Sequence, residues 1–162
     1  MNSQPDDTHL THVDGQGQAR MVDVGSKPIT RRLATARSTC RMQPETARQV
    51  RANANKKGDV LQVARIAAIM AAKRTDSLIP LCHSLPLDSV SVEFEWQSEA
   101  QLRISATVAC TGRTGVEMEA LVAVSVAGLT VYDMCKSIDR ELCIENVELV
   151  SKSGGVHGDF QR

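Results

Sequence analysis

The chain has 162 residues, of which 42% are apolar, 23% charged and only 2% aromatic, and its formal net charge is zero. This composition is typical of one soluble globular domain and excludes a disordered or fibrous protein. The scarcity of aromatic side chains disfavours a protein that stacks nucleic-acid bases, so we expect no nucleic-acid partner. Residues 1–57 carry twice as many basic as acidic side chains. This basic part is either a solvated surface or a surface that covers an anionic ligand.

The five cysteines and the N-terminal segment indicate in which cellular compartment the protein is expected. No two cysteines form a C-x-x-C pair, which argues against a secreted disulfide framework and against a cysteine-rich zinc site. The polar N-terminal MNSQPDDTHL lacks the apolar core of a signal peptide. The longest apolar stretch, 120–132, falls short of the roughly 18–20 residues that span a bilayer. We expect a cytoplasmic protein with no membrane partner.

The N-terminal third predicts one short strand and two helices. Residues 1–20 are polar and predicted to be flexible, and 21–162 are predicted to form a single domain. Residues 21–24 fit a short strand. A helix is predicted from about residue 43 to residue 55, because Pro44 is favoured in a first helical turn. Asp59 is predicted to cap a second helix that ends near Thr75.

The remaining segments predict a loop, a hairpin, a long helix and a last strand. Residues 78–87, with two prolines, are predicted to form an apolar loop. Alternating apolar residues in 90–96 and 102–110 predict the two strands of a hairpin. Residues 115–137 predict a helix that is apolar on nearly every side and must be buried all round. Since a sheet covers only one side, we expect a subunit interface to cover the other. Residues 142–150 predict a strand, and the whole pattern is α+β.

Two groups of residues have the chemistry of an acid/base site. Asp133 and Lys136 lie three residues apart on one helix face. They form either a surface ion pair or a half-buried pair in which each side chain tunes the pKa of the other. His83 lies in the apolar loop and has either a structural or a catalytic role. No set of three or four ligands accompanies it, so we expect no metal site.

Two further segments have the chemistry of an anion site. Lys57 precedes the helix that Asp59 caps, where lysines and exposed N–H groups together attract anions. Residues 152–155, Lys-Ser-Gly-Gly, combine a cation and a hydroxyl with glycines whose N–H groups can approach phosphate oxygens. The Walker spacing is absent, so this is not a P-loop. Both segments are equally compatible with solvated surface lysines.

Long segments of the chain closely resemble one family, the cyclic pyranopterin monophosphate synthases, or molybdenum cofactor biosynthesis C proteins. The segments are KKGDVLQVARIAAIMAAKRTDSLIPLCHSLPL, TGVEMEALVAVSVAGLTVYDMCKSID and LVSKSGG, and the resemblance runs from about Leu10 to Arg162. It implies a ferredoxin-like α+β sandwich, with an antiparallel sheet packed against helices, in which 21–162 is the catalytic domain. It also implies a homohexamer, a trimer of dimers, with the active site at the dimer interface.

The resemblance implies a lyase of molybdenum cofactor (molybdopterin) biosynthesis. Its substrate is 3′,8-cyclo-7,8-dihydroguanosine 5′-triphosphate, and its products are cyclic pyranopterin monophosphate and pyrophosphate. No redox step is required, so no cofactor is expected. The sequence leaves open whether a magnesium ion accompanies the phosphates. A non-catalytic nucleotide-binding subunit and a purely structural interaction protein are the alternatives.

Carried over residue by residue, the resemblance implies four catalytic side chains: Asp133, Lys136, Lys57 and His83. The lysines are expected to act as general acids with lowered pKa values, and Asp133 to orient Lys136 or remove a proton. Substrate-binding roles are implied for Leu81, Cys82, His83, Met118, Glu119, Lys152 and Arg32, with Arg31 as the alternative to Arg32. After KSGG, Val156 and His157 replace the usual Lys-Ser, so one phosphate-binding cation is either missing or replaced by His157.

Overall fold

The computed structural model describes residues 13, 15–54, 58–156 and 158–162. The strands are β1 (Thr30–Arg41), β2 (Leu87–Trp96), β3 (Gln101–Gly112), β4 (Cys143–Ser153) and β5 (Phe160–Gln161). The helices are α1 (Pro44–Arg51), α2 (Val60–Ala72), α3 (Thr75–Leu78) and α4 (Glu117–Cys135).

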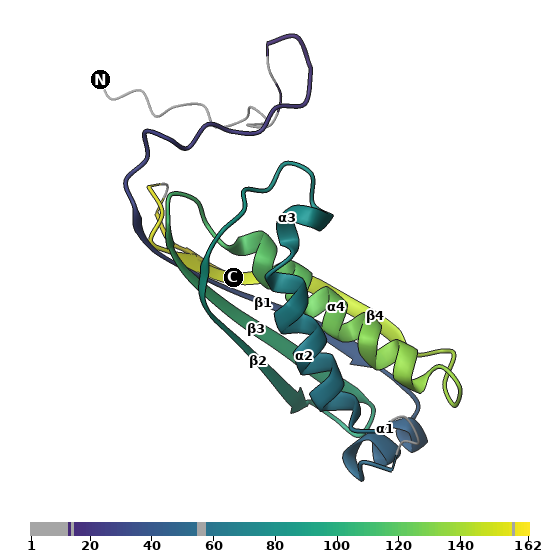
Figure 1. Ribbon diagram of the computed structural model, residues 1–162. Helices are drawn as coiled ribbons and strands as arrows, with labels where there is room; N and C mark the ends of the chain where they lie inside the picture. The colour runs from purple at the N-terminus through teal and green to yellow at the C-terminus, as the bar shows by residue number, and fades with distance from the viewer. Residues whose placement is uncertain (1–12, 14, 55–57, 157) are drawn as a thin grey trace.

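The strands form one antiparallel sheet in the order β2-β3-β1-β4-β5. Helices α2 and α4 lie side by side on one face of this sheet (Figure 1). The connection from β1 to β2 crosses over β3, which lies between them in the sheet, and the connection from β3 to β4 crosses over β1. These split β-α-β crossovers are those of the ferredoxin-like fold. The predicted α+β sandwich, with helices packed on an antiparallel sheet, is confirmed.

The central strand β1 was not predicted, and a strand was predicted in the wrong place. In β1 the side chains that face the helices are small, and Ala34, Ala36 and Cys40 are at most 1% exposed. The predicted strand at residues 21–24 is instead the start of a turn. There the Asp23 carboxylate accepts a hydrogen bond from the Gly25 N–H at 2.8 Å, and the backbone oxygen of residue 24 accepts one from residue 27 at 3.0 Å.

The other predicted elements are confirmed with shifted bounds. The hairpin is β2 and β3, and the residues of β3 that face the helices are fully buried: Leu102, Ile104, Ala106 and Val108. Asp59 caps α2 by accepting a hydrogen bond from the Gln62 N–H at 3.0 Å. Helix α1 ends at Arg51, earlier than predicted, and residues 55–57 lie outside the described part of the chain.

Helix α4 is covered from two sides within the chain. It packs on β1, β3 and β4 with one face and along α2 with another, so α2 supplies much of the cover that the sequence assigned to another subunit. Leu129 remains 58% exposed. By length and composition α4 also matches a membrane-spanning helix, but more than half of it is buried inside the fold, as in the core helix of a globular protein.

Candidate active site

The predicted site residues lie at opposite ends of α4. Glu119 is in its first turn, close to the loop that carries His83, whereas Asp133 and Lys136 are at its last turn. An α-helix rises about 1.5 Å per residue, so the 14 residues between Glu119 and Asp133 span about 21 Å. One chain therefore brings together only part of the predicted site. Lys57 lies outside the described residues.

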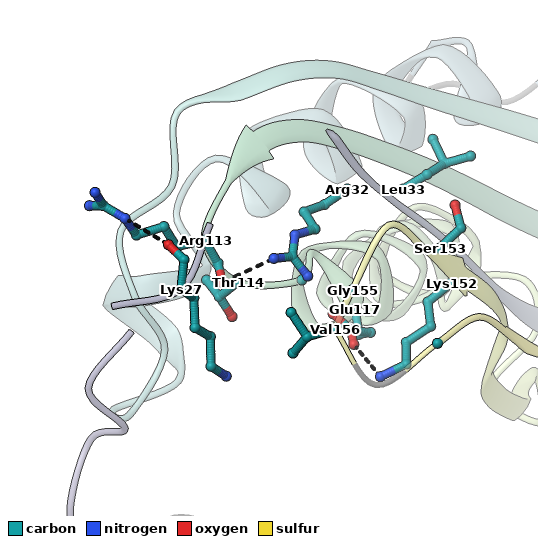
Figure 2. Close-up of a pocket in the computed structure, with 12 residues that line it drawn as sticks. Lys27, Arg32, Leu33, Arg113, Thr114, Glu117, Lys152, Ser153, Gly155 and Val156 are labelled. Carbon is teal, nitrogen blue, oxygen red and sulfur yellow. Dashed lines mark hydrogen bonds and ion pairs between the residues drawn. The ribbon is translucent and has the colours of Figure 1, made fainter. Parts of the chain in front are cut away.

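A cavity of about 150 Å³ lies where the ends of β1 and β4 meet the start of α4, and we call it the cationic cavity. Figure 2 shows four basic side chains around it, from Lys27, Arg32, Arg113 and Lys152. Arg32 is only 5% exposed, and its guanidinium donates to the backbone oxygens of Gly112 and Arg113 at 3.4 and 3.3 Å. The structure thus selects Arg32 over the exposed Arg31 as the arginine of this cavity.

The turn after β4 brings Lys152 and its glycines to the cationic cavity. Gly154 has a φ of +87°, and a Cβ at this position would collide with the backbone oxygen of Arg31, so no other residue fits. The Thr30 hydroxyl donates to the Gly154 oxygen at 2.7 Å, and the Asp159 carboxylate accepts from the Gly154 N–H at 3.2 Å. Lys152 Nζ lies 3.0 Å from a carboxylate oxygen of Glu117.

A larger cavity of about 370 Å³ adjoins the first, and we call it the mixed cavity because apolar and polar side chains line it together. It gathers most of the predicted substrate-binding residues: Leu81, Cys82, His83, Met118 and Glu119. The two cavities share four residues, Lys27, Thr114, Gly115 and Glu117. The cationic cavity and the mixed cavity are therefore contiguous, and these four residues line the place where they meet.

Glu119 is the buried acid of the mixed cavity. It is 4% exposed, and burial, followed by the negative charges of Glu117 and Asp76, raises its pKa from 4.5 to about 7. A carboxyl group with this pKa both accepts and donates a proton near neutral pH. Burial, and next Glu119, also raises the pKa of the neighbouring Cys82 thiol. The raised pKa keeps the Cys82 thiol protonated near neutral pH, and a protonated thiol is not a nucleophile.

Asp133 and Lys136 form an exposed ion pair within the single chain. Lys136 Nζ lies 2.5 Å from Asp133 Oδ1, and both side chains are more than half exposed, at 52% and 60%. The hydrogen bond from Lys136 and the charge of Asp133 raise the lysine pKa. Of the two alternatives for this pair, the single chain shows the surface ion pair, with the lysine pKa raised rather than lowered.

Two basic residues of the cationic cavity were missed from the sequence. Neither Lys27 nor Arg113 was assigned a role from the sequence, and the turn at residues 23–27 and the end of β3 place them at the cavity. Val156, at the position where the family usually has Lys, lines the same cavity, whereas His157 lies outside the described residues. Within the described ranges, no three His, Cys, Asp or Glu side chains gather to hold a metal ion.

The topology and the paired cavities define a ferredoxin-like α+β domain with a cation-lined pocket that opens into a larger mixed one. Residues 21–155 match the MoaC family, and the chain belongs to that family.

Relatives of similar length carry one name. A cyclic pyranopterin monophosphate synthase of Herpetosiphon aurantiacus is 60% identical over 94% of this chain and 93% of its own length. A protein of the same name from Brevibacillus brevis is 54% identical over 94% of this chain and 96% of its own. Molybdenum cofactor biosynthesis protein 1 of Drosophila melanogaster is 58% identical over 96% of this chain, which spans only 27% of that longer protein.

Proposed function

We propose that this chain is a cyclic pyranopterin monophosphate synthase, a lyase of molybdenum cofactor biosynthesis. It converts 3′,8-cyclo-7,8-dihydroguanosine 5′-triphosphate to cyclic pyranopterin monophosphate and releases pyrophosphate. Membership of the MoaC family and identities above 50% over nearly the whole chain support this function. No redox step is involved, and the chemistry consists of proton transfers and one phosphoryl transfer.

The observation that carries the proposal is the contiguity of the two cavities. The substrate joins a chain of phosphates to a nearly neutral heterocycle and sugar, so it needs a cationic pocket that opens directly into a less charged one. The cationic cavity, with Arg32 and Lys152, suits the phosphates, and the mixed cavity, with His83 and Glu119, suits the heterocycle. Glu119 exchanges protons there while the purine-derived ring opens and the pterin forms.

The second part of the proposal is that two subunits complete each active site. Asp133 lies about 21 Å along α4 from Glu119, and Lys136 follows the last residue of the helix, so both are too far to act on a substrate in the mixed cavity of the same chain. A second subunit that presents its last α4 turn to this cavity supplies both groups. Enclosure there removes water from the ion pair, so that Asp133 orients Lys136 or removes a proton and Lys136 acts as a general acid, together with Lys57.

The assembly that meets this requirement is the family's homohexamer, a trimer of dimers with the active site at the dimer interface. We propose this assembly and a cytoplasmic location for the chain. The exposure of Asp133 and Lys136 in the single chain supports the proposal, because a catalytic pair is better enclosed than open to water.

Turnover tests the activity directly. The purified protein, given the cyclised dihydro-GTP, should release pyrophosphate and a pterin product in equal amounts. Asp133→Asn and Lys136→Ala should each lose at least about 100-fold in kcat while the far-ultraviolet circular dichroism and Tm stay unchanged, since both side chains are exposed in the chain. A non-catalytic nucleotide-binding subunit would instead bind the substrate without turnover.

Mixing inactive variants tests the shared site. His83→Ala damages the mixed cavity, and Asp133→Asn damages the last turn of α4 that the other subunit presents to it, so each hetero-dimer from a reassembled equal mixture contains one intact site. Random pairing gives about a quarter of parental activity. The matched control mixes Asp133→Asn with Lys136→Ala, which damage the same end and give no recovery. Equal recovery in both mixtures, or none in the first, contradicts a site built from two subunits.

A further inference from the structure

We propose that the buried carboxylate of Asp139 positions the proposed catalytic pair, Asp133 and Lys136, by tying the turn after α4 to the start of α1. This inference rests on the proposed function and adds a positioning residue to its site. Asp139 is only 4% exposed, although the residues on both sides of it are exposed. Among the described residues, Glu119 is the only other buried carboxylate. A buried charge is costly unless hydrogen bonds satisfy it, so the contacts of Asp139 indicate what it holds in place.

Both carboxylate oxygens of Asp139 accept hydrogen bonds from the backbone. Oδ2 accepts from the Gln43 N–H at 2.7 Å, and Oδ1 accepts from the Glu141 N–H at 3.1 Å. Gln43 directly precedes the first turn of α1, where a helix favours a negative charge. One side chain therefore joins the turn after α4 to the start of α1, and Figure 1 shows both at the same end of the molecule.

The backbone of Asp139 is tied to α4 as well. Its N–H donates to the Cys135 oxygen at 3.0 Å, and the Ile138 N–H donates to the same oxygen at 2.9 Å. Cys135 is fully buried and directly precedes Lys136. The hydrogen bonds thus run from α1 through Asp139 to the residue before Lys136. As a result, the start of α1 fixes the backbone from which the Lys136 side chain extends.

This backbone matters because the side chains of the pair are open to solvent. Lys136 is 52% exposed, and its ion-pair partner Asp133 is 60% exposed and belongs to the same end of α4. Neither side chain fixes the other relative to the rest of the fold, so the turn determines where both lie. A displacement of about 1 Å in a reacting group costs up to about 100-fold in rate.

Steady-state kinetics of Asp139→Asn test this role. The amide keeps the shape of the carboxylate but replaces one acceptor oxygen with an NH2 donor, so one of the two hydrogen bonds is lost. We expect kcat to fall about 30-fold and KM to change by less than about twofold, because the cavities at the start of α4 bind the substrate. Glu141→Gln is the matched control. It removes an exposed carboxylate of the same turn, which accepts from Gln43 Nε2 at 3.0 Å, and should leave kcat unchanged.

Subunit mixing separates positioning from a general loss of stability. Reassembled with His83→Ala, Asp139→Asn should regain about a quarter of parental activity, since each hetero-dimer then contains one intact site. Reassembled with Asp133→Asn, which damages the same end of α4, it should regain none. Hydrogen exchange gives a readout without turnover. In Asp139→Asn the amides of residues 138 and 139 should exchange about tenfold faster, and those of the middle of α4 at the parental rate.

Each outcome decides the assignment. A parental kcat or unchanged exchange in Asp139→Asn overturns it, and so does a loss that appears in KM or that both mixtures repair equally. Absence of recovery with His83→Ala, where Asp133→Asn recovers in the same test, overturns it as well.

A second variant keeps the test decisive if Asp139→Asn does not fold. Gln43→Pro removes the N–H that Asp139 accepts from, and the φ of −64° at this residue already suits proline. The same loss in kcat is expected, and a parental kcat contradicts the assignment. If exchange accelerates but the parent does not convert the cyclised dihydro-GTP, the proposed function fails and with it the role of Asp139 in catalysis, while its tie to α1 stands.

Discussion

The pKa of the Glu119 carboxyl group is set by the position of this residue in the fold. Its position in the first turn of a helix would by itself favour the charged form, because a helix N-terminus stabilises negative charge. Burial beside Glu117 and Asp76 outweighs this preference and raises the pKa to about 7. The native protein therefore holds a proton on Glu119 at pH values where the unfolded chain has released it.

The raised pKa predicts how the stability depends on pH. Between pH 4.5 and about 7 the folded state binds more protons at Glu119 than the unfolded state, so its contribution to the free energy of unfolding is complete below pH 4.5 and is lost as the pH rises through 7. Glu119→Gln should match the parent near pH 5 and exceed its stability near pH 8 by up to about 3 kcal/mol.

Urea unfolding of both proteins at the two pH values measures this difference. Other carboxyl groups titrate in the same range, and subtracting the parent from the variant removes their effect. A constant difference between pH 5 and pH 8 would show that Glu119 is charged at both.

Single residues of the site were predictable from sequence, but their grouping was not. The strings around His83, Glu119 and Asp133 identify these residues through family resemblance. The predicted helix over 115–137 already separates Asp133 from Glu119, but the exposure of Asp133 in the single chain and the cavity around Glu119 are evident only in the structure. Lys27 was assigned no role from the sequence, and its place at the two cavities is fixed in part by the hydrogen bond that its backbone oxygen accepts from Arg113, a residue far along the chain.

At the scale of elements, the contrast between apolar and polar residues determined what was predictable. In β2 and β3, Val, Phe, Leu and Ile alternate with polar residues, so the hairpin is evident. From Leu33 to Arg41 the inward positions of β1 hold Ala, Ser and Cys and the outward ones Leu, Thr and Arg, so the hydropathy hardly alternates. Small residues are required there because α4 packs closely on the strand. The central strand β1 was therefore the strand that the hydropathy pattern did not predict.

The close approach of α4 to the sheet can be tested at Gly128. A Cβ at this position would lie 3.0 Å from Ile144 Cγ2, a residue of β4. Gly128→Val adds two further methyl groups to this contact and should destabilise the protein by about 2–3 kcal/mol, as overpacking of a core does.

A double-mutant cycle provides the control for Gly128. Shortening the opposing side chain with Ile144→Ala should recover part of the loss, so that Gly128→Val costs less in the Ile144→Ala background than in the parent. Thermal or urea unfolding of the four proteins gives the coupling. Strict additivity of the two substitutions would show that the residues do not share the contact.

At the scale of the whole molecule, the helical layer leaves apolar side chains in solvent. On α2, Val63, Ile66 and Met70 are 42%, 59% and 47% exposed, and their spacing of three and four residues places them on one stripe. Leu129 on the neighbouring α4 is 58% exposed. Exposed apolar side chains on adjacent helices are typical of a surface that another subunit covers.

A charge placed on this stripe should separate the subunits. Ile66→Asp and Leu129→Asp should lower the mass measured by light scattering at micromolar concentration and lower turnover with it, because the proposed site needs two chains. Circular dichroism should stay unchanged, since both side chains are more than half exposed. Lys73→Asp, an exposed change at the end of α2, is the control for added negative charge. A monodisperse monomer of the parent protein would contradict the assembly itself.

The central place of β1 also governs the order in which the molecule can fold. Among the described strands it is the first in the sequence, yet its partners are far along the chain: Ala36 pairs with Ala106, and Ala34 pairs with Lys152. Contacts between such distant residues slow folding, because a long loop must close before pairing stabilises it. During synthesis β1 therefore waits with both edges unpaired until β3 is complete. Pairing of β4 with the other edge of β1 then brings Lys152 and Ser153 to the cationic cavity.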